Sequence, residues 1–185
     1  MYKKGRAFTD HNELKTVVDS LRTLGSKIVL TQGSYDLVHI GHARYLDAAK
    51  KEGDVLIVGI DDDEKIRTRK GIDRPVVPEG ERMEMVLHLR PVDFVYLKKL
   101  NDPKWHLIKV VRPDVLIAVE DTYTPEDIKA LEEFCGKVVV LDRQATTSTS
   151  AKIRLMQLKT AKKLEEALTP KLLKVLQETL GTQEE

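Results

Sequence analysis

Residues 30–45 of the chain read LTQGSYDLVHIGHARY and centre on the motif His-Ile-Gly-His at positions 39–42. The apolar run before this motif, at residues 27–31, predicts a strand, and the apolar spacing after it predicts a helix that ends at Gly53. Ligands bind parallel α/β sheets where strands end and helices begin. The N–H groups and the dipole of a helix start favour phosphate there. Two imidazoles three residues apart can donate hydrogen bonds to one such anion.

The same two histidines are also compatible with a metal half-site or with a structural role. A zinc site needs further histidine, cysteine or carboxylate ligands. The other histidines, His11, His88 and His106, and the single cysteine, Cys135, are not spaced like a partner pair. We therefore predict no protein metal site, and the residues alone leave phosphate binding and a structural role open.

Strand and helix patterns alternate along most of the chain. An N-terminal helix is expected to start in a capping box at Asp10 and Glu13 and to end at Gly25. Further helices are expected at about residues 43–53, 79–89, 102–110 and 125–134, and from about residue 151. Strands are expected at residues 27–31, 55–60, 94–97, 115–119 and 138–141. Apolar strands that alternate with helices predict a three-layer α/β fold around a parallel sheet.

Two segments do not follow this alternation. Residues 61–70 are first acidic and then basic, and they read as a solvated loop or, because they follow a strand, as part of a ligand crevice. From residue 155 to residue 180, leucines at helical spacing predict amphipathic helices broken at Pro170. These helices cover a sheet edge or form a contact in a homodimer, and the sequence leaves both open. We accordingly expect one domain at residues 1–154 and a C-terminal helical extension at residues 155–185.

The composition points to a globular protein of the cytoplasm. With 185 residues, the chain is long enough for one domain with its own core. Its 31 Lys and Arg against 30 Asp and Glu give a net charge of +1, which gives no reason to expect nucleic acid as a partner. A single cysteine excludes an internal disulfide framework and suits a reducing compartment. The N-terminus is polar and no apolar run approaches the roughly 18 residues of a membrane span, so neither a signal peptide nor a span is expected.

The motif at residues 39–42 is one of four blocks that resemble the cytidylyltransferase-like nucleotidyltransferases. The mark of that family is an HxGH motif after the first strand, and residues 33–64, GSYDLVHIGHARYLDAAKKEGDVLIVGIDDDE, look like its signature segment. The other blocks, in the family's order, are Arg69-Lys70-Gly71 with Arg74-Pro75-Val76, Glu81-Arg82-Met83, and Arg143 followed by Ser148-Thr149-Ser150. The resemblance covers about residues 25–154. It implies a Rossmann-like sheet of five parallel strands in the order 3-2-1-4-5, numbered as they occur along the chain.

The resemblance also implies a reaction, nucleotidyl transfer, in which a phosphorylated small molecule attacks the α-phosphate of a nucleoside triphosphate and releases pyrophosphate. His39, His42 and Lys70 would be the catalytic residues, which hold the phosphates as charge develops. Nucleotide or phosphate contacts are implied for Gly33, Ser34, Tyr35, Asp36, Gly41, Arg82, Asp121, Arg143, Ser148, Thr149 and Ser150. Mg²⁺ is expected on the triphosphate, held by phosphate and water more than by the protein.

Simpler structural interpretations exist beside these implied roles. Arg82 lies off the apolar stripe of its helix and reads equally as a surface arginine. Residues 146–150 read equally as an ordinary serine or threonine helix cap. Trp105 and His106 are interpreted as structural, because a lone tryptophan usually serves packing.

The choice of nucleotide and acceptor depends on finer similarities. The spacing of the Arg-Pro-Val and Glu-Arg-Met blocks looks most like bacterial heptose 1-phosphate adenylyltransferases, which favours ATP and a sugar phosphate. Residues 33–46 and the Ser-Thr-Ser run at 148–150 look as much like choline- and ethanolamine-phosphate cytidylyltransferases. An alternative is therefore a CTP-dependent cytidylyltransferase for glycerol, ethanolamine or choline phosphate, and another is a nucleotide-binding protein without catalysis. Sugar-phosphate relatives tend to carry a Lys-Gly-Gly-Asp or Gly-Asp-Asp turn where this chain has Ala118-Val119-Glu120-Asp121, which leaves the acceptor open.

Overall fold

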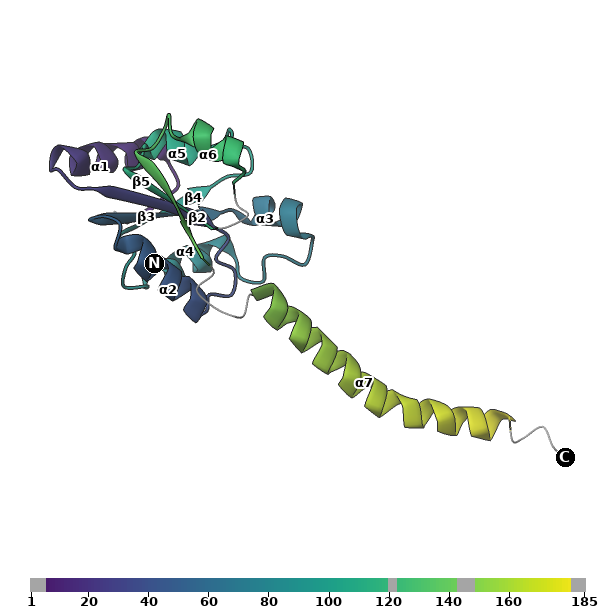
Figure 1. Cartoon of the computed structure of the whole chain (residues 1–185). Coiled ribbons are helices and arrows are strands. Elements are labelled where there is room, and N and C mark those ends of the chain that lie inside the picture. The colour runs from purple at the N-terminus through teal and green to yellow at the C-terminus, as the bar shows by residue number, and fades with distance from the viewer. Residues whose placement is uncertain (1–5, 120–122, 143–148, 181–185) are drawn as a thin grey trace. The chain divides into compact units, whose positions relative to one another are not determined.

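The computed structural model describes residues 6–119, 123–142 and 149–180 (Figure 1). The chain divides into two compact units, residues 1–146 and 147–185. The first unit contains, in chain order, β1 Ala7–Phe8, α1 His11–Thr23, β2 Ile28–Gly33, α2 Ile40–Lys50, β3 Val55–Asp61, α3 Asp63–Lys70, α4 Glu79–Leu87, β4 Phe94–Lys98, α5 His106–Val111, β5 Val115–Val119, α6 Pro125–Leu131 and β6 Lys137–Leu141. The second unit contains the helix α7, Thr149–Leu180.

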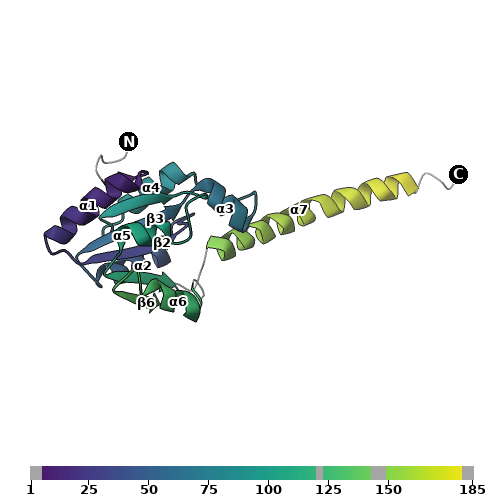
Figure 2. The same cartoon turned by 90° about the horizontal axis from the view of Figure 1, so that it is seen from above.

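The sheet of the first unit has six parallel strands in the order β1-β4-β3-β2-β5-β6. The five predicted strands are β2 to β6 and take the predicted order, with β6 at one edge beside α6 (Figure 2). The predicted number of five is wrong, because β1 adds a sixth strand beside β4. β1 has two residues, too few for a periodic pattern, and Arg6 fixes it by donating hydrogen bonds to the backbone oxygens of Val92 and Asp93.

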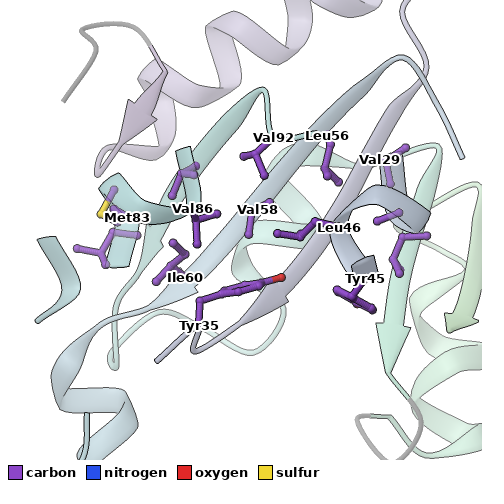
Figure 3. Close-up of a cluster of buried hydrophobic side chains, with 14 of the residues drawn as sticks. Val29, Tyr35, Tyr45, Leu46, Leu56, Val58, Ile60, Met83, Val86 and Val92 are labelled. Carbon is purple, nitrogen blue, oxygen red and sulfur yellow. The ribbon is translucent and has the colours of Figure 1, made fainter. Parts of the chain in front are cut away.

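Helices cover both faces of this sheet. α1, α5 and α6 lie on one face, and α2 and α4 lie on the other (Figure 1). Successive side chains of a strand point to opposite faces, so Ile28 and Leu30 of β2 pack with α1 and α5, whereas Val29 packs with Leu46 of α2. Figure 3 shows this second core, which also takes in Met83 of α4. All seven residues of the central strand β3 are buried, as a doubly covered parallel sheet requires.

The charged segment after β3 forms the helix α3, so the interpretation as a solvated loop is wrong. The carboxylate of Asp62 caps this helix by accepting a hydrogen bond from the Lys65 N–H at 2.7 Å. Acidic residues occupy its first turn and basic residues its last, which complements the helix dipole. Because Ile66 is the buried residue of α3 and no apolar stripe exists, hydrophobic periodicity did not reveal the helix.

The helix α5 begins later than the predicted helix at residues 102–110. Trp105 has a left-handed backbone with φ of 61°, so the helical conformation starts only at His106. A bulky residue with positive φ is uncommon and costs about 1–3 kcal/mol, so its surroundings must hold it there. Pro103 therefore lies in the segment before α5 and not at the first position of the helix.

The second unit differs from its prediction as well. α7 is one helix with Pro170 inside it, whereas the sequence predicted a break at that residue. A proline in a helix removes one backbone hydrogen bond, and the leucine, lysine and glutamate residues around it are strong helix formers that continue the helix. Within the described part of the chain, no helix combines the length and the apolar character needed to cross a membrane.

Candidate active site

His39 and His42 form a reciprocal cap at the start of α2. His39 is the N-cap residue, and its Nδ1 accepts a hydrogen bond from the Gly41 N–H at 3.1 Å. Nδ1 of His42 accepts a hydrogen bond from the His39 N–H at 3.2 Å. The two ring centroids lie 4.1 Å apart. Serine, threonine, aspartate and asparagine are the usual residues of such caps, so two histidines here point to a role beyond capping.

The cap determines the tautomer of both rings. An imidazole nitrogen that accepts a hydrogen bond carries no proton, so each neutral ring holds its proton on Nε2. His39 and His42 are therefore both Nε2–H donors at the N-terminus of α2. Two such donors, together with the positive end of the helix dipole, suit a phosphate group.

The segment that leads from β2 to this cap is strained and is held by Asp36. Tyr35 and Leu37 have left-handed backbones, with φ of 51° and 52°. Between them Asp36 is 3% exposed, and its carboxylate accepts hydrogen bonds from Arg74 Nε at 2.7 Å and from the backbone N–H groups of residues 76–77 at 3.1 and 3.0 Å. Burial raises the pKa of Asp36, but these N–H groups and Arg74 outweigh it and hold the pKa below its ordinary value. Asp36 thus positions the turn that precedes His39.

Gly33 and Tyr35 pack against each other at the end of β2. A Cβ on Gly33 would lie 3.0 Å from Cε2 of Tyr35, so the glycine makes room for the ring. Tyr35 is buried in the core with Tyr45 and Leu46 (Figure 3). Its hydroxyl has no hydrogen-bond partner among the described residues, and burial raises the pKa of this phenol well above its ordinary value. The nucleotide contacts implied for both residues remain predictions.

Arg82 is buried, with 1% of its surface exposed, so the interpretation as a surface arginine is wrong. Its guanidinium donates to the backbone oxygens of Ser34 at 2.5 Å and Asp61 at 2.8 Å. It also donates to the backbone oxygen of Val77 at 2.9 Å and pairs with the carboxylate of Asp63 at 2.8 Å. Arg82 therefore braces α4 against the ends of β2 and β3, and its implied contact with phosphate remains a prediction.

A pocket of about 480 Å³ opens at the carboxyl ends of four neighbouring strands, β4, β3, β2 and β5. The strands and α3 contribute Gln32, Gly33, Asp61, Lys98, Val119, Lys65, Arg69 and Lys70. The connections next to the strands contribute Ser34, Asp102, Pro103, Lys104, Trp105 and Tyr123, and the start of α5 contributes His106 and Leu107. Its size suits a small molecule, and its position is the usual ligand site of a parallel sheet.

Asp61 is the buried charge of this pocket, with 1% of its surface exposed. Lys98 lies directly opposite on the next strand and pairs with the Asp61 carboxylate at 3.0 Å, and Arg69 pairs with it at 3.1 Å. The Arg69 guanidinium also reaches the Ser34 hydroxyl at 3.4 Å. Burial lowers the pKa of Lys98, while Asp61 acts in the opposite direction. One carboxylate thus holds two cations in the pocket wall.

Lys70, the last residue of α3, lines the same pocket. No hydrogen bond or ion pair joins its ammonium group to another residue in the described ranges. Desolvation lowers the pKa of Lys70, the nearby Arg69 and Arg74 lower it further, and Asp61 and Asp36 offset only part of this. A cation crowded by other cations gains from an anionic ligand, because such a ligand offsets both the desolvation and the repulsion.

Sequence reasoning did not select Gly59, Lys98 or Trp105 as site residues. A Cβ on Gly59 would lie 2.5 Å from Cδ2 of Leu107 and 2.8 Å from Cδ of Lys98, so this glycine makes room for the pocket lining. A glycine inside a buried strand and a lysine at the end of one are unusual, and these were the available signals. Trp105 gave no signal, because its place in the pocket depends on a left-handed backbone.

The sequence-predicted residues divide into four groups. Tyr35, Asp36 and Arg82 form the buried supports described above. Gly33, Ser34 and Lys70 line the pocket. His39, Gly41 and His42 form the cap of α2, at the other end of the same β2–α2 connection. Asp121, Arg143 and Ser148, with the side chains of Thr149 and Ser150, lie outside the described residues.

The chain is similar to several known proteins over most of its length. Residues 30–154 match the family model described as cytidylyltransferase-like. The bifunctional protein HldE of Desulfatibacillum aliphaticivorans is 38% identical over 141 residues, which cover 75% of this chain and 28% of that protein. HldE of Alkalilimnicola ehrlichii is 39% identical over 158 residues, which cover 84% of this chain and 33% of that protein. The chain therefore spans about a third of the length of these curated relatives.

Solved structures confirm the predicted α/β fold. The lipopolysaccharide core biosynthesis protein from Thermoplasma volcanium GSS1 has a TM-score of 0.57 and 28% identity, covering 64% of this chain and 98% of that one. Pantoate-beta-alanine ligase from Francisella tularensis has a TM-score of 0.59 and 18% identity, covers 78% of this chain and 69% of its own, and shares the fold alone. The family match covers more than half of the chain and confirms the nucleotidyltransferase family recognised from the sequence. The chain belongs to the cytidylyltransferase-like family.

Proposed function

We propose that this chain is a nucleotidyltransferase that joins a nucleoside triphosphate to a small phosphorylated acceptor and releases pyrophosphate. The observation that carries the proposal is the reciprocal cap of His39 and His42, which makes both rings Nε2–H donors at the start of α2. The connection that ends in this cap begins at Gly33 and Ser34, which line the cationic pocket. A triphosphate at the cap and an acceptor in the pocket would meet along this connection.

The proposed reaction does not require the enzyme to remove a proton from a weakly acidic group. An oxygen of the acceptor phosphate attacks the α-phosphorus, and the bond from that phosphorus to the β-bridging oxygen breaks, so the electron pair leaves on pyrophosphate. A phosphate monoester is already anionic near neutral pH and needs no strong general base. The site must instead align the reacting groups and neutralise developing charge. His39 and His42 would donate to the transferred phosphate, and Lys70 would bind the acceptor phosphate.

The charge of the pocket supports an anionic acceptor. Five cationic side chains and two carboxylates line it. Asp61 offsets part of the charge of Lys98 and Arg69, whereas Lys70 has no such counter-ion among the described residues. Choline or ethanolamine phosphate would bring a further cation into this pocket, which the existing cations would repel. Polar groups such as Gln32, which donates to the Tyr123 hydroxyl at 3.1 Å, suit the hydroxyl groups of a sugar.

Mg²⁺ is proposed as the companion of the triphosphate. The described ranges of the chain contain no group of three or more His, Cys, Asp or Glu residues suited to hold a metal ion. Asp36, in the connection that leads to the cap, pairs with Arg74, and in the pocket Asp61 pairs with Lys98 while Asp102 accepts a hydrogen bond from the Lys99 N–H. This donor set fits an ion carried by phosphate oxygens and water, which is the usual state of nucleotide-bound Mg²⁺. When bound, it would supply charge neutralisation on the triphosphate.

ATP and a sugar phosphate are the proposed substrates. The identity with HldE proteins and the resemblance of the Arg-Pro-Val and Glu-Arg-Met blocks to heptose 1-phosphate adenylyltransferases support this choice. A second candidate is CTP with a phospho-alcohol, because the segment around His39 resembles those enzymes equally. A homodimer and a cytoplasmic location also remain predictions from the sequence.

The direct test is pyrophosphate release by the full chain with Mg²⁺. ATP and CTP are each combined with heptose 1-phosphate, mannose 1-phosphate, glycerol 3-phosphate and choline phosphate. We expect release with ATP that depends on a sugar phosphate. Release only with CTP and glycerol 3-phosphate would favour the second candidate. Triphosphate binding by calorimetry without release for any pair would indicate a nucleotide-binding protein that does not catalyse transfer.

A further inference from the structure

Trp105 combines three features that a packing residue does not require. It is the one tryptophan of the chain, it lines the pocket, and it has a positive φ of 61°. Strained backbone at a bulky residue persists only where the surrounding structure holds it, and such residues gather at ligand sites. Its side chain is half-buried: it packs in part against the core under α1 and α5, and it also lines the pocket.

The neighbours of Trp105 fix the indole in place. The Lys104 ammonium lies over the ring, 4.3 Å from its centroid. Lys104 is itself anchored by the carboxylate of Asp127 in α6, at 2.9 Å. On the other side in sequence, the His106 ring packs edge-on against His11 of α1, with centroids 5.2 Å apart. Lys104 thus covers one face of the indole, and the core packing of Trp105 restricts the ring before any ligand arrives, which lowers the entropic cost of binding on the other face.

The pocket offers two kinds of surface to one ligand. α3 contributes the cations Lys65, Arg69 and Lys70, whereas the segment at residues 103–107 contributes the apolar side chains of proline, tryptophan and leucine together with Lys104 and His106. A ligand that satisfies both kinds has a phosphate at one end and a flat apolar face at the other. A pyranose ring is such a group, because its axial C–H groups form an apolar face while its hydroxyls remain free for polar partners.

We infer that Trp105 is a specificity-determining residue for the acceptor, and that its indole stacks on the sugar ring of a phosphorylated sugar whose phosphate binds α3. This inference rests on the proposed function and extends it to the substrate class. Stacking favours ring-shaped sugar phosphates over short phospho-alcohols, which have no flat face for the indole. The nucleotide base is a less suitable occupant, because the proposed triphosphate site at His39 and His42 does not line this pocket.

The single tryptophan makes the test direct, because all indole emission of the full chain comes from Trp105. The protein is titrated, without nucleotide, with heptose 1-phosphate and mannose 1-phosphate. Glycerol 3-phosphate, inorganic phosphate and ATP with Mg²⁺ are the controls. We expect a saturable change of emission with at least one sugar phosphate that is several-fold larger than with glycerol 3-phosphate or phosphate. A response to ATP with none to the sugar phosphates would overturn the inference.

A matched pair of variants separates stacking from packing. Trp105→Leu keeps an apolar side chain but removes the aromatic face, and Trp105→Phe keeps a smaller one. We expect Trp105→Leu to raise the KM for the sugar phosphate about tenfold, and Trp105→Phe about threefold or less. The KM for ATP and the kcat should change little in both. An unchanged acceptor KM in a folded Trp105→Leu would overturn the inference, and if that variant does not fold, the wild-type emission decides.

The two experiments also separate this inference from the proposed function. Sugar-phosphate-dependent release of pyrophosphate with a silent indole would overturn the role of Trp105 and leave the transferase intact. A saturable indole response to a sugar phosphate, without turnover for any triphosphate, would support the stacking site and contradict the transferase.

Discussion

The cap at the start of α2 and the pocket at the ends of the strands are built in opposite ways. In the cap, His39, Gly41 and His42 lie within four residues and bind one another's backbone. In the pocket, Asp61 and Lys98 come from neighbouring strands and meet through the sheet register, and Trp105 joins them through a left-handed turn. The residues of the cap can therefore be recognised from the sequence, whereas the residues of the pocket can be grouped only once the tertiary structure is known.

Turnover should depend most strongly on the cap, where the loss of a single donor nitrogen, Nε2 of His42, should lower kcat. His42→Asn keeps an acceptor near the position of Nδ1 and removes the donor at Nε2, and His42→Gln does the reverse. We expect His42→Asn to lower kcat by about a hundredfold or more, because a transition-state donor is lost. Its free energy of unfolding should stay within about 0.5 kcal/mol of wild type, because the cap is retained.

His42→Gln is the matched control for this experiment. It should lose about 0.5–1 kcal/mol of stability with the cap and keep more of the turnover than His42→Asn. Pyrophosphate release gives kcat, and urea unfolding gives stability. A His42→Asn variant with nearly wild-type kcat would rule out a donor role for the Nε2–H group.

Asp36 links the cap to the rest of the fold, and its loss should appear as lost stability. Asp36→Asn keeps the shape but leaves Arg74 without its carboxylate, and we expect a loss of about 2 kcal/mol at pH 7. The pKa of Asp36 is held below its ordinary value, so the stability it provides is complete above about pH 4 and falls as the pH drops through the folded pKa. Wild type and variant should therefore converge in acid. Urea midpoints at pH 7, 5 and 3 test this, and a constant difference would contradict it.

Lys70 tests the charge of the pocket. We expect Lys70→Ala to lower kcat/KM for the acceptor about tenfold, the usual scale for one charge-assisted contact. Because the pKa of Lys70 is lowered, wild-type activity should decline at a lower pH than an ordinary lysine would give. Lys70→Arg keeps its charge above pH 12 and should remove that alkaline decline. An identical decline in Lys70→Arg would show that another group titrates.

Gly59 should give the smallest effect, confined to the pocket. In Gly59→Ala the new methyl group would displace Leu107 and Lys98, and we expect a loss of about 1 kcal/mol with a modest rise in acceptor KM. Gly25→Ala is the control, since Gly25 has φ of 79° and open space around it, so its cost is backbone strain alone. Acceptor KM should change in Gly59→Ala only. An equal change in both would mean that the pocket responds to general destabilisation.

The elements with strong local signals were predictable. The apolar run of β3 and the spacing of α2 predicted a parallel sheet with helices on its faces, and four sequence blocks predicted the family and, through it, the strand order. β1 was not predicted, because two residues are too short to show a periodic pattern. α3 was not predicted, because a helix cap and its charged residues stabilise it and it has no apolar stripe. Both elements are stabilised by individual hydrogen bonds and by the placement of charges. Hydrophobic periodicity does not predict such elements.

The site shows the same limit at the level of single side chains. The two histidines were predictable as a pair, because their spacing alone places them on one turn. The burial of Arg82 was not predictable, because it depends on backbone oxygens at the ends of β2 and β3. Lys98 and Trp105 enter the pocket only through strand register and an unusual φ angle. A charged or aromatic residue in a sequence therefore acquires its role from partners that the sequence places far away.

The fate of labelled phosphate shows directly which bond of the triphosphate breaks and which group is transferred. ATP labelled at the α-phosphate and ATP labelled at the γ-phosphate are each incubated with the protein, Mg²⁺ and a sugar 1-phosphate. We expect the α-label in the sugar product and the γ-label in pyrophosphate, because the acceptor attacks the α-phosphorus. Transfer of the γ-label to the sugar, or no acceptor-dependent movement of either label in a protein that binds ATP, would contradict the account.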